Sequence, residues 1–135
     1  MAADEQARLI IEYLTPKLSP YVIYLFGSRA GGQTHPGSDF DIAYISEKKF
    51  DTYGRFIISQ ELAASLNADV DLIDLQMAST VFQTQVIASG VVLYCSDELK
   101  RATFEMYTLK KYARLNEERA DVLENLVRRA IKYEK

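Results

Sequence analysis

Two features in the first half of the chain have the residue types and spacing for phosphate chemistry. Asp39 and Asp41 stand two apart in an alternating segment, so in a β-strand their carboxylates project side by side from one face. Gly27-Ser28 directly follow a short apolar run, where a turn can offer backbone N–H groups and a hydroxyl to a phosphate. Ten residues separate Ser28 from Asp39. Together these features indicate an all-oxygen site for a divalent metal and a nucleotide.

Further carboxylates lie in the segment around Asp71. Asp71 can join Asp39 and Asp41 if the two strands pair in a suitable register, and three converging acids are costly without a metal because like charges repel. Asp69 shares the face of Asp71 and is an alternative ligand. Asp74 falls on the other face, where a structural role is expected.

The elements that must position these residues alternate between helix and strand. A first helix has apolar residues at i, i+3, i+4 and i+7 from Ala7 to Leu14, and Pro16 and Pro20 mark its expected end. The other expected helices cover residues 50–66, ending at Asn67, and a segment capped by Ser79 and stopped by Gly90. The strands are predicted over residues 21–26, 39–45, 69–75 and 91–94, the first of them central and buried on both faces.

This order predicts one α/β (α+β) domain with a small mixed β-sheet flanked by helices. The length of 135 residues and the 48% hydrophobic composition suit a single packed core. Residues 1–96 form the predicted core, and residues 97–135 a helical C-terminal extension of the same domain.

The extension has apolar residues in rows seven apart, including Ala102, Leu109 and Leu123. Unbroken, it would be about 57 Å long, whereas a sphere of this chain length is roughly 37 Å across. It therefore either breaks near Asn116 into two ordinary helices packed on the sheet, or protrudes as an arm whose apolar seam needs a partner.

Charge and composition exclude several classes of function. With 16 Lys and Arg against 19 Asp and Glu, the net charge of -3 disfavours binding of long nucleic acid. The longest uncharged apolar run, residues 21–26, is far too short to cross a membrane, and the N-terminus lacks the basic head of a signal peptide. We expect a cytoplasmic protein. The single Cys95 fits a reducing compartment, and the single His35 is expected to be solvated.

The Gly27-Ser28 turn, the Asp39-Phe40-Asp41 triplet and the later residues 70–75 resemble the minimal nucleotidyltransferase (MNT) branch of the DNA polymerase β superfamily. The resemblance covers about residues 7–95 and is closest across residues 24–45. It implies the nucleotidyltransferase fold, ATP as substrate, and two Mg²⁺ ions at Asp39 and Asp41. It further implies that Asp71 completes one metal site and helps to activate the attacking hydroxyl.

The same resemblance assigns the triphosphate to Gly27 and Ser28 and adds Arg29 and Ser38 to the nucleotide-binding residues. Relatives commonly carry another basic residue where this chain has Gly31, so nucleotide affinity here is expected to depend on Arg29.

The small size of the chain points to an acceptor supplied by another protein. Its resemblance to antitoxins of the HEPN/MNT type implies transfer of AMP from ATP to a tyrosine hydroxyl of a HEPN RNase toxin, which neutralises the toxin. A small-molecule nucleotidyltransferase, such as one acting on aminoglycosides, is one alternative, with a homodimer supplying the missing wall. An antitoxin that acts by stoichiometric binding alone is the other.

Overall fold

The computed structural model describes residues 3–31 and 39–133, which form a four-stranded mixed sheet with helices on both faces. The strands are β1 (Val22–Phe26), β2 (Phe40–Ile45), β3 (Val70–Asp74) and β4 (Val91–Cys95), in the order β3-β2-β1-β4. β1 runs antiparallel to both β2 and β4, and β2 runs parallel to β3. The predicted mixed sheet is confirmed, with β1 in its interior.

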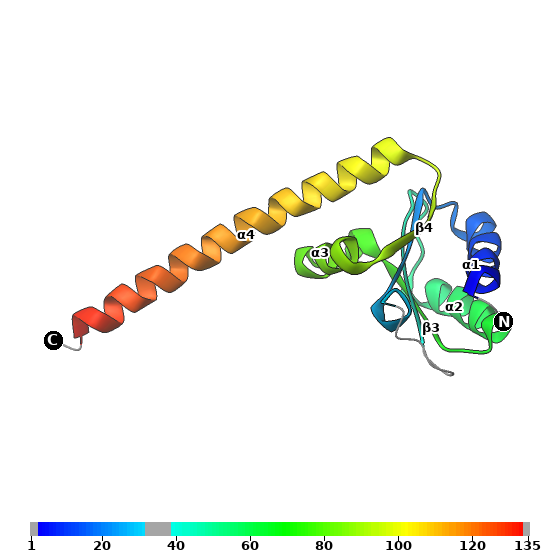
Figure 1. The fold of residues 1–135 in the computed structure, drawn as a ribbon, viewed down its shortest axis with the longest axis horizontal. Helices are drawn as coiled ribbons and strands as arrows, with labels where there is room; N and C mark the ends of the chain where they lie inside the picture. The colour runs from blue at the N-terminus through cyan, green and yellow to red at the C-terminus, as the bar shows by residue number, and fades with distance from the viewer. Residues whose placement is uncertain (1–2, 32–38, 134–135) are drawn as a thin grey trace.

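Two pairs of helices enclose the sheet (Figure 1). α1 (Ala3–Leu18) and α2 (Thr52–Leu66) pack on one face, over a core that includes Leu14, Ile42 and Leu62. α3 (Thr80–Ser89) and the start of α4 (Glu98–Tyr133) lie on the other, over a second cluster that includes Tyr24 and Val86. The alternation of side chains along each strand therefore determines which pair of helices each strand residue faces.

Capping residues close the helix ends near the predicted positions, through side chains at Asp51 and Ser79 and through the backbone at Asn67 and Gly90. Asp51 accepts a hydrogen bond from the Gly54 amide at 2.7 Å, and Ser79 accepts one from the Phe82 amide at 3.1 Å. Asn67 ends α2 in the left-handed conformation, with φ at 53°, and Gly90 follows α3. These caps confirm the boundaries expected at Ser79, Asn67 and Gly90.

The first helix ends at Leu18, between Pro16 and Pro20 as expected, and it includes Pro16 in its last turn. There the missing N–H of Pro16 removes a single helical hydrogen bond. Leu14 and Leu18 are fully buried on the sheet and hold that turn in place. The helix is followed by Ser19, whose φ is 45° and whose amide donates to the Thr15 carbonyl at 3.0 Å.

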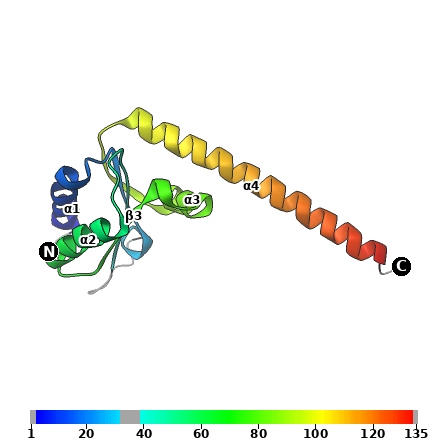
Figure 2. The same ribbon diagram turned by 180° about the vertical axis from the view of Figure 1, so that it is seen from behind.

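The C-terminal extension is one continuous helix, so the expectation of a break near Asn116 is wrong. α4 has 36 residues, about 54 Å at 1.5 Å per residue, and runs far beyond the sheet (Figures 1 and 2). Its first part packs on α3, whereas every residue from Asn116 to Ile131 is exposed. The alternative expectation of a protruding arm is therefore confirmed. None of the described helices is both long and apolar enough to span a bilayer.

Candidate active site

The turn after β1 brings Gly27 against the carboxylate of Asp41. Antiparallel pairing sets Phe26 opposite Asp41, and Gly27 then turns with a positive φ of 75° into the short turn Gly27–Arg29. A Cβ at Gly27 would overlap the Oδ2 atom of Asp41 and lie 3.1 Å from its Cγ. Both the backbone angle and this close approach require glycine here.

Parallel pairing of β2 with β3 supplies the register on which the third carboxylate depends. Asp41 is paired with Asp71, so the two side chains leave the sheet next to each other on one face. One step earlier, the Phe40 amide donates to the Asp69 carbonyl at 2.9 Å, which brings Asp39 and Asp69 to the same region. All of these carboxylates lie on the face that α3 and α4 cover elsewhere.

The pKa of Asp41 responds to the neighbouring carboxylates. Partial burial raises the pKa of Asp41 above its usual value, and the negative charges of Asp71 and Asp39 raise it further. Asp39 and Asp71 are themselves exposed. The cluster therefore concentrates negative charge, and a bound cation would relieve this repulsion.

The donor set fits Mg²⁺ bound together with a nucleotide. Within residues 3–31 and 39–133, no three acidic, histidine or cysteine side chains form a ready-made ligand shell. Mg²⁺ does not need one, because it typically takes one or two carboxylates and completes its octahedron with phosphate oxygens and water. That mode of binding suits this site, because Asp39, Asp41 and Asp71 offer only carboxylate oxygens. The negative charges around Asp41 also favour a bound cation.

The Arg29 guanidinium packs against Phe40, a residue of the core on the other face of the sheet. It stacks on the Phe40 ring at 3.7 Å from the centroid, and its Nη1 donates to Gln6 Oε1 at 3.5 Å. Phe40 belongs to the core under α1 and α2, on the opposite face of the sheet from Asp41. Ser28 is exposed in the turn, whereas Ser38 and His35 lie outside the described residues.

Asp74 has the structural role expected of it. Its buried carboxylate accepts a hydrogen bond from the Gln76 amide at 3.1 Å, and its Oδ2 lies 4.0 Å from the Lys49 ammonium. It faces the opposite side of the sheet from Asp71. Asp69 is exposed on the same face as Asp71 and lines the same cavity.

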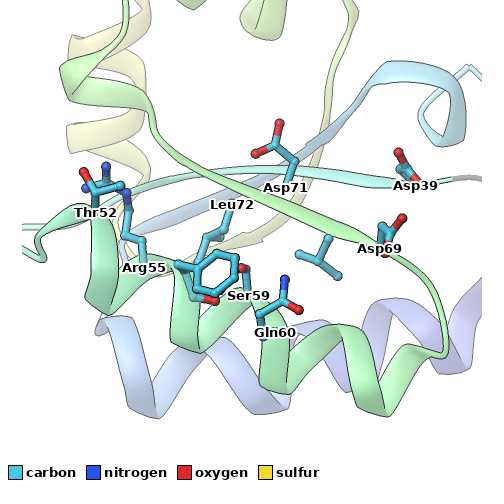
Figure 3. A pocket seen from close by; sticks show the side chains of 10 residues that line it. Asp39, Thr52, Arg55, Ser59, Gln60, Asp69, Asp71 and Leu72 are labelled. Carbon is cyan, nitrogen blue, oxygen red and sulfur yellow. Dashed lines mark hydrogen bonds between the residues drawn. The ribbon is translucent and has the colours of Figure 1, made fainter.

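A cavity of about 390 Å³ lies along β3 and was not anticipated from the sequence. Asp39, Asp69 and Asp71 contribute to its walls at one side, and Figure 3 shows that α2 supplies polar side chains at the other. The Arg55 guanidinium is held there by the Phe50 carbonyl at 2.9 Å. The α2 residues that line the cavity are Thr52, Arg55, Phe56, Ser59 and Gln60. Ser59 is a polar residue beside the buried Ile58, Leu62 and Leu66 of α2, and a polar residue among apolar neighbours was the available signal.

The family described as Polymerase beta, Nucleotidyltransferase matches residues 8–99. The chain belongs to this family. The protein adenylyltransferase MntA of Shewanella oneidensis is 39% identical over 115 residues, spanning 83% of this chain and 78% of the relative.

Two solved structures extend the likeness to the whole fold. A toxin–antitoxin crystal structure with AMP-PNP superposes with a TM-score of 0.79 at 34% identity, covering 90% of this chain and 98% of that one. A tri-AMPylated Shewanella oneidensis HEPN toxin in complex with its MNT antitoxin gives a TM-score of 0.75 at 31% identity, covering 92% and 98%. At 90% coverage about 14 residues are left out, fewer than the 36 of α4, so part of α4 superposes as well.

Proposed function

We propose that this protein is an antitoxin that transfers AMP from ATP to a tyrosine hydroxyl of a partner HEPN RNase toxin and thereby neutralises it. The observation that carries the proposal is the register that sets Asp71 beside Asp41, with Gly27 packed against the same carboxylate. Membership of the nucleotidyltransferase family, a relative named protein adenylyltransferase, and related structures with AMP-PNP and an AMPylated toxin support it. ATP is a cytoplasmic substrate, and we place the protein in the cytoplasm.

The nucleotide is assigned to the turn at the end of β1. Gly27 allows the backbone to come close to a phosphate, and Ser28 is an exposed residue of the same turn with an N–H group and a hydroxyl to offer. Asp39 and Asp41 would hold two Mg²⁺ ions, with Asp71 as a further ligand of one of them. When bound, the two cations neutralise the triphosphate and stabilise charge on the attacking and leaving oxygens.

Asp71 is the residue that we assign to the attacking hydroxyl. The tyrosine oxygen forms a bond to the α-phosphorus of ATP, its proton passes to the Asp71 carboxylate, and the bond from the α-phosphorus to pyrophosphate breaks. In-line displacement requires the two oxygens on opposite sides of the phosphorus. The strand order β3-β2-β1 agrees, because Asp71 lies on one side of the β2 carboxylates and Gly27 on the other.

The exposed half of α4 is the surface that we assign to toxin binding. Val122, Leu123 and Leu126 are among the exposed apolar side chains that line a groove there. A toxin–antitoxin crystal structure with AMP-PNP matches 90% of this chain, which includes part of α4 and supports a toxin as the partner. We therefore name the HEPN toxin as the molecule that covers this groove.

Transfer from labelled ATP tests the proposal. We expect label on the HEPN toxin in the presence of Mg²⁺, and none on aminoglycosides offered at the same concentration. Mn²⁺ is expected to replace Mg²⁺, whereas Ca²⁺ is a poor substitute because its longer, looser coordination misplaces the reacting oxygens. Transfer at full rate in excess EDTA contradicts the metal assignment, and label on the aminoglycoside alone contradicts the choice of acceptor.

A further inference from the structure

β3 is an edge strand with an outer side that carries no partner strand in the described part of the chain. The Asp69 carbonyl faces β2, where it accepts the Phe40 amide at 2.9 Å. Because backbone groups alternate in direction along a strand, those of Asp71 also face β2, and those of Val70 and Leu72 point outward. An extended peptide could therefore pair with Val70 and Leu72 without disturbing the existing sheet.

The cavity beside β3 follows this open edge and is lined from both faces of the sheet. Asp39 and Asp71 contribute from the carboxylate face, and residues of α2 contribute from the other. In Figure 3 the Asp71 carboxylate lies on the opposite side of β3 from Ser59 and Gln60. A ligand that fills such a groove needs side chains directed to both sides of β3, as an extended peptide has.

We propose that the acceptor segment of the toxin binds as a fifth strand on the outer edge of β3, with its acceptor tyrosine opposite Asp71. The proposal rests on the proposed function and adds the conformation of the protein substrate. Residues directly opposite in a sheet share a face, so this tyrosine points to the carboxylate cluster. Its two neighbours in sequence point to the other face, toward Phe56 and Gln60.

The remaining features of this edge agree with a selective peptide site. Phe56 lines the cavity with 55% of its surface exposed, so it offers an aromatic contact to an incoming side chain. The other edge strand, β4, lies on the far side of β1 from β2, so a peptide paired there would place no hydroxyl near Asp71. Tyrosine suits the edge geometry because its ring carries the hydroxyl well away from the peptide backbone.

Photocrosslinking tests where the acceptor segment lies. The photoreactive amino acid p-benzoylphenylalanine replaces Phe56, and in a matched control it replaces Tyr53, which is 72% exposed on the same helix but does not line the cavity. We expect the Phe56 probe to crosslink the toxin next to the tyrosine that mass spectrometry identifies as AMPylated. A crosslink to a distant segment, or equal crosslinking of that segment by the Tyr53 probe, overturns the proposal.

A pair of substitutions at Val70 tests the backbone contact. Val70→Pro removes the outward N–H, and Val70→Ala removes most of the side chain but keeps that N–H; proline is tolerated at the first residue of an edge strand. We expect Val70→Pro to raise the KM for the toxin about tenfold over Val70→Ala, with the KM for ATP equal in both. Equal toxin KM values overturn the proposal, and if Val70→Pro does not fold, the crosslink decides.

The two proposals fail in different ways. If the unsubstituted chain does not label the toxin from ATP, the proposed function is wrong, and the crosslink still reports whether a toxin segment occupies the edge of β3. If the toxin is labelled while the crosslink falls away from the AMPylated tyrosine, the function stands and the fifth strand is wrong.

Discussion

The end of the sheet that carries Asp39, Asp41 and Asp71 is held in place by contacts between strands, whereas the exposed half of α4 is held by contacts within its own helix. Asp41 is held by pairing on both sides, with Phe26 on β1 and Asp71 on β3, and Gly27 closes over its carboxylate. The distal part of α4 has its own helical hydrogen bonds and pairs such as Arg128 with Glu124 at 2.7 Å. The proposed catalytic residues thus lie where the chain packs against itself, whereas the distal part of α4 presents exposed apolar side chains.

Two helical leucines illustrate the same contrast through their exposed surface. Leu14 of α1 is fully buried, whereas 53% of the surface of Leu126 on α4 is exposed. Burying a leucine side chain is worth about 1.5–3 kcal/mol, which Leu14 contributes to folding of this chain. Leu126 can contribute a comparable amount only in a complex.

The largest effect is expected at Asp41. Asp41→Asn should reduce AMP transfer to below about a thousandth, because the metal loses a charged ligand. The same change should leave the metal-free fold as stable or slightly more stable, since it relieves repulsion from Asp39 and Asp71. Transfer assays and calorimetric melts measure the two effects. A loss of activity that only follows a lowered melting temperature would mean that the carboxylate is structural.

Gly27→Ala should lower AMP transfer by distorting the backbone of the turn after β1. The added Cβ would overlap the Asp41 carboxylate and force a positive φ on alanine, which costs about 1–3 kcal/mol. We expect transfer to fall about a hundredfold, the order of the larger strain cost. Gly31→Ala is the control, because its nearest contact is the Ser28 carbonyl at 3.8 Å. Equal activity of the two variants would contradict the assigned role of Gly27.

Removal of the arm should separate partner binding from nucleotide binding. A chain ending at Asn116 keeps both core clusters, so its melting temperature and ATP affinity should stay unchanged. Its affinity for the toxin should fall at least about tenfold, the loss of one well-buried apolar contact. Titration calorimetry measures both affinities. If ATP affinity collapses with the fold, the segment belongs to the core; if neither affinity changes, the arm is dispensable.

The raised pKa of Asp41 predicts a pH dependence of folding in the metal-free protein. The folded chain binds this proton more tightly than the unfolded chain, so stability should fall as the pH rises from the usual carboxyl pKa of 3.8 to the raised value. Urea titrations in EDTA across this range should show a decline that Asp41→Asn reduces. An identical pH profile in the two proteins would show that the pKa of Asp41 is not raised in the folded chain.

The smallest effect on folding is expected for Leu126→Ala. The side chain contacts little within this chain, so the free energy of unfolding should change by no more than about 0.5 kcal/mol. Toxin affinity should nevertheless decrease. Urea unfolding and calorimetric titration with the toxin measure the two quantities, and an unchanged toxin affinity would place the contact elsewhere on α4.

The sequence predicted the elements of the core better than their pairing. Alternation and apolar runs located the four strands, and Ser79 and Asn67 bounded their helices, because these signals are local. The pairing of Asp41 with Asp71 is a long-range property of the β2–β3 ladder, so the sequence could state only that a suitable register was needed. The Gly27 contact with Asp41 depends on the same tertiary arrangement.

The break expected near Asn116 is wrong because a local pattern does not show what a helix packs against. The first helix ends between Pro16 and Pro20 as expected, and burial of Leu18 holds its last turn. The periodicity of α4 is the same whether the helix breaks at Asn116 or continues, since it does not reveal what covers the apolar row. The direction of Arg29, stacked on Phe40, also follows from packing that its position after Ser28 does not disclose.

The central claim is that the carboxylates of this chain transfer AMP from ATP to a tyrosine of a HEPN toxin. Intact-mass and tandem mass spectrometry of the toxin, after incubation with this protein, ATP and Mg²⁺, test it most directly. We predict one or more AMP groups on tyrosine, absent when Asp41→Asn replaces the unsubstituted chain. A toxin that gains no AMP, or gains as much from the Asp41→Asn variant, would contradict the account.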